Sequence, residues 1–322
     1  MAGQQQAGYE PYYVPESSKM AILATIGLVT TIFGAASIMN DMTFGEPGAQ
    51  TNSWFIFTVG LAFFAGVLAY WFSMAVRENL EGKNSAQLKR SYVMGMQWFI
   101  FSEVMFFFGF FLALFYMRWF SGPWLAEGPT QELLWQGFQY SWPLMETPQD
   151  AIGGAANQAA FMANNGEFTG PDRNLNFPGF SEMFHWLPLY NTVLLLASSV
   201  TVHWAHHALL HDDRKKFNLW LGFTILLAIV FLYLQYMEYH EAYVEYGLKL
   251  TSGAYGTTFF MLTGFHGFHV AMGMVMLLVQ FLRSTLKGHF TSTDHFGFAA
   301  ASWYWHFVDV VWIFLVLVVY VF

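Results

Sequence analysis

MGMQWFIFSEVMFFFGFFLALFY, residues 94–116, is an apolar stretch that carries one charge, Glu103, near its middle. About 20 apolar residues at 1.5 Å each cross the ~30 Å hydrocarbon core of a bilayer, so the stretch predicts a transmembrane helix. A charged side chain at mid-depth costs at least about 2.5 kcal/mol. We therefore expect Glu103 to face protein, water or a partner, or to hold a proton.

The helical neighbours of Glu103 are aromatic. Positions i−4, i+3, i+4 and i+7 from it are Phe99, Phe106, Phe107 and Phe110. Such a surround disfavours the charged form, so we expect a neutral carboxyl at rest. Two roles remain open: a protonated acid that bonds to a neighbouring helix, and a proton-linked or reactive group, since ionisable residues within membranes are generally functional.

Composition places the whole chain in the membrane. Of 322 residues, 56% are hydrophobic, 20% aromatic and 11% charged. This indicates a polytopic membrane protein, and no nucleic-acid partner is expected. The absence of cysteine excludes disulfides, thiolate copper sites, iron–sulfur clusters and covalently attached c-type haem.

Six further apolar runs are predicted to span, giving seven helices in all: about 20–39, 54–76, 187–209, 219–238, 255–282 and 298–322. Residues 147–180 are rich in Gly, Ala and Asn and predict an extramembrane, partly irregular segment. The expected organisation is a tail (1–19) without the apolar region of a cleaved signal, helices 1–2 (20–76), an inner loop (77–91), helix 3 (92–116), a long outer loop (117–186) and helices 4–7 (187–322).

Lysine and arginine are distributed unequally over alternate loops. Ten of them lie in the tail and in the connectors 77–90, 211–216 and 283–295, while only Arg118, Arg173 and Lys249 lie on the opposite side. Positive charge favours the cytoplasmic side, so we expect the N-terminus inside and the C-terminus outside. The outer segments are acidic, which fits either solvated loops or the steering of a basic soluble partner.

The histidines allow two interpretations. His203, His206, His207 and His211 follow an H-x-x-H-H pattern, which places imidazoles on one helix face as in membrane di-iron oxygenases; His266 and His269 form a second i, i+3 pair. No second such box supplies the remaining ligands, and the two groups lie at different depths, so we expect no metal. Helix-to-helix hydrogen bonds are the alternative, with His306 and Asp309 as a buried i, i+3 polar pair.

Several long blocks together resemble subunit III of the haem–copper oxidases that use cytochrome c. They lie in the family's order and cover most of the chain: FSEVMFFFGFF (101–111), LPLYNTVLLLAS (187–198), WAHHALLHDDRK (204–215), LQYMEYHEAY (234–243), YGTTFFMLTGFHGFHV (255–270) and HFTSTDHFGFAAASWYWHF continuing to Tyr320 (289–320).

The resemblance implies a seven-helix subunit without haem or copper of its own, associated with the catalytic subunit I and with subunit II of a proton-pumping oxidase that reduces oxygen to water. Helices 1–2 would stand apart from a bundle of helices 3–7, with structural phospholipids in the cleft. By resemblance, Glu103 is the buried carbodiimide-reactive carboxylate, while Arg77, Glu78, Arg283 and His289 lie near lipid head groups. The subunit would stabilise the catalytic subunit and sustain its proton uptake.

The predicted topology is consistent with part of these roles. Arg77 and Arg283 fall at the inner interface, where a guanidinium can pair with a lipid phosphate or act as an ordinary positive-inside anchor. The inner histidines His207, His211, His289 and His295 could collect protons, because imidazole titrates near neutral pH.

The chain departs from shorter members of the family in the outer loop, where about 35 extra residues leave the role of residues 117–184 open. Helices 1–2 favour cytochrome c over quinol as the donor to the complex, since related quinol oxidase subunits generally have only the five later helices. The extended loop and the absence of a targeting peptide favour a bacterial inner membrane. A stand-alone, His-ligated di-iron oxygenase is the alternative function.

Overall fold

The computed structural model describes residues 17–45, 51–136, 138–144, 177–250 and 252–322. All regular structure in these ranges is helical, and seven of the helices are long and apolar enough to cross a membrane. The predicted all-helical fold with seven spans is therefore confirmed. Most of the predicted tail (1–19) and most of the 147–180 segment lie outside the described residues.

The chain divides into two compact units, Met1–Gly95 and Met96–Phe322, and each is described by itself. The lipid-holding cleft expected between helices 1–2 and the later helices therefore stays a prediction. The first unit contains α1 (Met20–Phe44) and α2 (Ser53–Leu80), which are joined by a hydrogen bond at 2.5 Å from Ser53 Oγ to Asp41 Oδ2.

Helices α1 and α2 pack closely because glycines lie at their crossing. A Cβ atom at Gly27 would come within 2.9 Å of Phe64 Cα, and one at Gly60 within 2.7 Å of the backbone nitrogen of Thr31. In lipid, where burying apolar surface gives little drive for association, small residues let helix backbones gain packing contacts. These glycines thus hold α1 against α2.

Helix α3 (Ala86–Tyr116) carries Glu103. It continues through a π-helical turn (Met117–Ser121) into α4 (Gly122–Leu125), and the short α5 (Gly128–Leu134) follows. Helical bounds do not fix the depth of the bilayer, so the expected loops 77–91 and 117–186 remain predictions as membrane topology.

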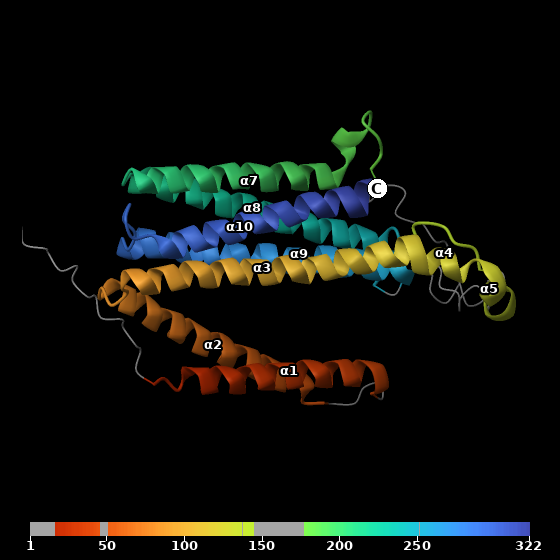
Figure 1. Cartoon of the computed structure of the whole chain (residues 1–322), viewed down its shortest axis with the longest axis horizontal. Helices are drawn as coiled ribbons and strands as arrows, with labels where there is room; N and C mark the ends of the chain where they lie inside the picture. Colours follow the sequence, from red (N-terminus) through yellow and green to blue (C-terminus); the bar gives the residue numbers. More distant parts are fainter. Residues whose placement is uncertain (1–16, 46–50, 137, 145–176, 251) are drawn as a thin grey trace, which may run out of the picture. The chain divides into compact units, whose positions relative to one another are not determined.

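The second unit holds the long helices α7, α8, α9 and α10 (Figure 1), in which α7 packs against α8 and α10, and α9 packs against α8 and α10. Side chains of α3 contact α9 and α10. A 3-10 turn precedes α7, and π-helical turns extend α9 and α10. The bounds are Met183–His185 for the 3-10 turn, Leu187–Leu210 for α7, Arg214–Val244 for α8, Gly253–Leu282 with Arg283–Lys287 for α9, and Phe296–Leu315 with Val316–Val321 for α10.

Large aromatic side chains of α10 fill the centre of this second unit. Trp305 and Trp312 are fully buried, and each indole donates a hydrogen bond to α7: Trp305 Nε1 to Ser198 Oγ at 2.9 Å and Trp312 Nε1 to Thr192 Oγ1 at 3.0 Å. Gly273 on α9 leaves room for Trp305. The resulting frame fixes the faces of α9 and α10 that meet α3.

Candidate functional site

The acid at the middle of α3 meets a histidine of α9. Glu103 Oε2 lies 2.9 Å from His269 Nε2, and the side chains are 22% and 8% exposed. The pair joins residues far apart in the sequence and lies in the apolar middle of two predicted spans. The carboxyl expected to contact a neighbouring helix thus has a specific partner there.

A backbone contact fixes the position of one proton of this pair. His269 Nδ1 lies 2.6 Å from the carbonyl oxygen of Phe265 one turn back, and a carbonyl can only accept, so Nδ1 carries a hydrogen. A neutral His269 then presents a lone pair at Nε2, and Glu103 must supply the proton of the shared bond. In the charged alternative His269 holds both protons and Glu103 none. Either way the pair holds one exchangeable proton and is neutral overall.

Aromatic rings pack against the imidazole of this pair. The rings of Phe106 and Phe107 lie 5.9 and 5.0 Å from the imidazole of His269, and Phe99 stacks with Tyr304 on α10 at 6.0 Å. A low-dielectric surround of this kind strengthens the hydrogen bond and penalises separate charges.

The H-x-x-H-H cluster on α7 does not converge on one point. His206 turns towards His295 before α10, with their Nε2 atoms 3.4 Å apart, whereas the ring of His207 lies 4.4 Å from that of His211. In the described part of the chain no group of three or more metal-ligating side chains comes together. This arrangement does not favour the di-iron alternative.

The deeper histidines are bonded within the second unit. His266 Nε2 donates to the carbonyl oxygen of Val308 at 3.1 Å, joining α9 to α10. His306 Nδ1 lies 2.8 Å from Ser199 Oγ on α7 and 3.6 Å from Asp309 Oδ2, which is beyond hydrogen-bonding distance. Ser199 is thus a partner of His306 that sequence spacing did not identify.

The residues proposed near lipid head groups lie at helix ends. Arg77 is exposed and Glu78 half-buried in the last turn of α2, in the first unit. In the second unit, Arg283 donates to Gln280 Oε1 at 2.9 Å, and its guanidinium lies 4.7 Å from the ring centre of Phe290. Arg283 Nε and His289 Nδ1 are buried and have no hydrogen-bond partner among the described residues.

A carboxyl more deeply buried than that of Glu103 lies near the C-terminal end of α8. Glu238 on α8 is 2% exposed, accepts from Tyr320 Oη at 2.6 Å, and lies 3.3 Å from Gln235 Nε2. No role is predicted for this acid from the sequence, although an acid at the end of the predicted 219–238 span is itself a signal of function.

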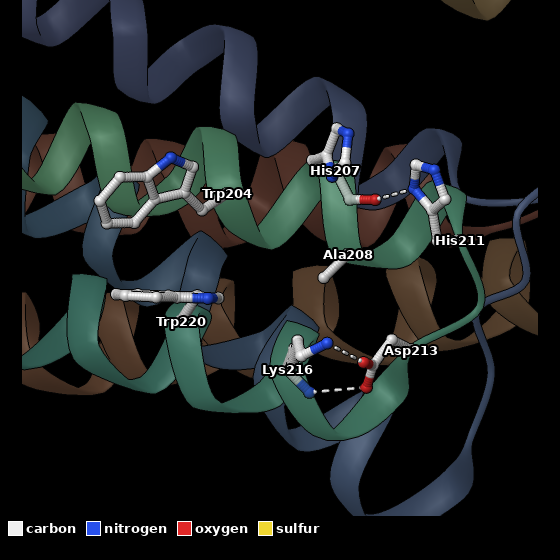
Figure 2. Close-up of a pocket in the computed structure, with 7 residues that line it drawn as sticks. All are labelled: Trp204, His207, Ala208, His211, Asp213, Lys216 and Trp220. Atoms are coloured by element: carbon white, nitrogen blue, oxygen red, sulfur yellow. Dashed lines mark hydrogen bonds and ion pairs between the residues drawn. The ribbon is translucent and has the colours of Figure 1, made fainter.

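The connection between α7 and α8 forms a cavity of about 380 Å³ (Figure 2). The indoles of Trp204 and Trp220, one on each helix, pack edge to face with ring centres 4.6 Å apart. Nearer the turn, Lys216 Nζ lies 2.9 Å from Asp213 Oδ2. The remaining lining residues are His207, Ala208 and His211.

Comparisons with known proteins agree with the resemblance. A family model described as cytochrome c oxidase subunit III matches residues 10–125 and 182–322. The chain is similar to "Cytochrome c oxidase subunit 3" of Struthio camelus, with 38% identity over 290 residues, 90% of this chain and 92% of the relative. It is also similar to the proteins of that name from Hippopotamus amphibius (38% over 270 residues, 84% of each chain) and Dugong dugon (40% over 252 residues, 78% of this chain and 77% of the relative).

Proposed function

The chain belongs to the cytochrome c oxidase subunit III family, and we propose that it serves its oxidase as a non-catalytic subunit that binds phospholipids, stabilises the catalytic subunit and supports proton uptake. Membership of the family makes it a subunit of an oxidoreductase complex of the respiratory chain. The predicted haems and copper belong to partner subunits, with subunits I and II as neighbours and cytochrome c as electron donor.

The main support for the non-catalytic role is that the histidines deep in the predicted spans bond to residues of the same chain. His266, His269 and His306 bond respectively to Val308, Glu103 and Ser199 of the same chain. Imidazoles committed in this way hold the helices in register. This supports a scaffold rather than a cofactor site.

Lipid binding in the second unit is supported by the donors near Arg283. The buried Nε of Arg283 and Nδ1 of His289 have no partner in the described part of the chain, and an unpaired buried donor is costly. A lipid phosphate can accept from both a guanidinium and an imidazole. In the first unit, exposed Arg77 with neighbouring Glu78 suits a head group that carries charges of both signs.

Counting the phospholipids retained by the purified complex, by native mass spectrometry, tests this role. R77Q and R283Q should each lower the count, while R90Q and K287Q, which remove cations from neighbouring segments, should leave it unchanged. Equal counts in all four variants would contradict the lipid role of Arg77 and Arg283.

Support of proton uptake is assigned to His207, His211 and His295. His207 and His211 are exposed side by side at the end of α7, and His295 is half-buried before α10. We expect the combined H207Q, H211Q and H295Q variant to slow proton uptake by the reconstituted oxidase, with H240Q, which changes an exposed histidine near the other end of α8, as the control. Unchanged uptake would remove this role.

The proposed location is a bacterial inner membrane, with the N-terminus cytoplasmic and the C-terminus periplasmic. The distribution of lysine and arginine supports this orientation. The family match leaves out residues 126–181, the region of the long outer loop on which the bacterial assignment rests. Protease accessibility of tags on the two termini in sealed vesicles tests the orientation.

A further inference from the structure

From the cavity between α7 and α8 we propose a binding site for a glycerophospholipid whose head group carries a phosphate and a primary ammonium, as in phosphatidylethanolamine. This site is separate from Arg77 and Arg283. The proposed site requires only that α7 and α8 span the membrane, so it can be tested independently of the lipid role proposed for those arginines.

The cavity is apolar at one end and charged at the other, as a phospholipid is. Trp204 and Trp220 lie within the predicted spans, about two turns from the connection, and their edge-to-face pair forms the apolar end of the cavity, while His211, Asp213 and Lys216 lie at the connection itself (Figure 2). Indoles are favoured at the level of the head groups, where one end of a molecule is apolar and the other wet. The volume of about 380 Å³ lies within the range typical of ligand sites.

The charges at the mouth match a head group of zero net charge. Lys216 and Asp213 contribute one positive and one negative charge, held 2.9 Å apart. Lys216 is 70% exposed and its ammonium has three donors, so it can bind a phosphate while it keeps its bond to Asp213. A head group lying alongside, with its phosphate near Lys216 and its ammonium near Asp213, places opposite charges next to each other.

The imidazole of His211 offers a hydrogen-bond acceptor, which favours an ammonium with N–H groups over a quaternary ammonium. His211 Nδ1 donates to the carbonyl oxygen of His207 at 2.9 Å, so a neutral His211 has its lone pair on Nε2. Together with the Asp213 carboxylate, this gives two acceptors for the N–H groups of a primary ammonium. A choline head group has no N–H groups and cannot satisfy them.

Photo-crosslinking with the intact oxidase complex in vesicles tests the proposal. The probes are phosphatidylethanolamine, phosphatidylcholine and phosphatidylglycerol with the same photoreactive acyl chain, and labelled peptides are located by mass spectrometry. We expect the ethanolamine probe to label the 203–220 segment about threefold or more above the other two, as expected for one exposed ionic contact. Labelling near Arg283 is read from a different peptide, so failure of either site is seen separately.

Two pairs of variants test the residues. D213N should lower ethanolamine labelling to the choline level while keeping the helix cap, because Asp213 Oδ1 accepts from the backbone nitrogen of Lys216 and an asparagine oxygen can do the same. D212N is its control, since Asp212 bonds Ser292 and does not line the cavity. K216Q should lower labelling by all three probes, because each carries the phosphate that Lys216 contacts, with K215Q as the control.

Four results would overturn the proposal. The first is equal labelling by the ethanolamine and choline probes in the unaltered complex, and the second is unchanged labelling in both D213N and K216Q. The third is crosslinking of this segment to another subunit in place of lipid, which would make the cavity a protein contact. Loss of labelling on addition of inorganic phosphate would assign the cavity to a soluble anion and would also overturn it.

Discussion

Glu103 Oε2 and His269 Nε2 lie 2.9 Å apart across the contact of α3 with α9, and the bond of His269 Nδ1 to the Phe265 carbonyl leaves one proton for this contact. The pair can therefore move a proton between carboxyl and imidazole without changing its total charge. In an apolar environment such a neutral pair is far less costly than either charge alone.

Replacing Glu103 with alanine should lower the stability of the complex more than replacing it with glutamine. In E103Q the amide can donate to His269 Nε2, whereas E103A leaves that buried nitrogen without its partner, at a cost of about 1–3 kcal/mol. We expect the thermal midpoint of the complex to fall further in E103A than in E103Q. Equal midpoints would show that the bond to His269 contributes nothing to stability.

The crossing of α1 and α2 should tolerate a large residue at one glycine of α2 and not at another. A side chain at Gly60 meets the backbone of Thr31, while Gly66 has nothing within 4 Å of its Cβ direction. G60L should destabilise the first unit by about 1–3 kcal/mol through overpacking, and G66L should have little effect. The measurement is the fraction of the subunit that stays with the oxidase during purification in detergent. Equal retention of the G60L and G66L variants would contradict the prediction.

The stability of the folded chain around Glu238 on α8 should depend on the hydroxyl of Tyr320. Y320F removes the hydroxyl that donates to Glu238 at 2.6 Å and leaves the buried carboxyl with a weaker set of donors. We expect a loss of about 1–3 kcal/mol in stability, measured as the midpoint of denaturant-induced helix loss. Y190F, which removes an exposed hydroxyl bonded to the Phe184 carbonyl, is the control and should change little.

Part of the stability that is lost at acidic pH should depend on His289. Desolvation, with the cations of Arg283 and Lys287 nearby, lowers the pKa of His289 from its usual 6.5. The folded state therefore binds fewer protons than the unfolded state just below pH 6.5, so stability is lost as the pH falls through that value. H289Q should reduce the fall in thermal midpoint between about pH 7 and pH 5. The exposed-site variant H240Q provides the comparison, and an unchanged fall in H289Q would refute the assignment.

The number of spans was predictable because each is a long apolar run, and hydropathy alone identifies such runs. The partner of Glu103 was not predictable. His269 lies 166 positions away, and α9 offers His266 one turn earlier with the same chemistry. Only the packing of α9 against α3 and α10 decides that His269 meets the acid while His266 meets the Val308 carbonyl.

The histidines of α7 show a second feature that sequence spacing does not determine. Residues at i, i+3 and i+4 share a helix face in general, but a face is wide enough for neighbours to differ in direction. His206 contacts His295 from the segment before α10, and His207 contacts His211 on its own helix. A spacing pattern therefore suggested a shared metal site that the tertiary contacts of α7 do not form.

The most direct test of the non-catalytic role is the iron and copper content of this chain after its separation from the purified oxidase, with the remaining subunits analysed in the same preparation. The account predicts only trace metal in the separated chain, and haem and copper in the remaining subunits. About one or two iron atoms retained per chain, as a di-iron or haem site would hold, would contradict it and make the histidines of α7 a metal centre.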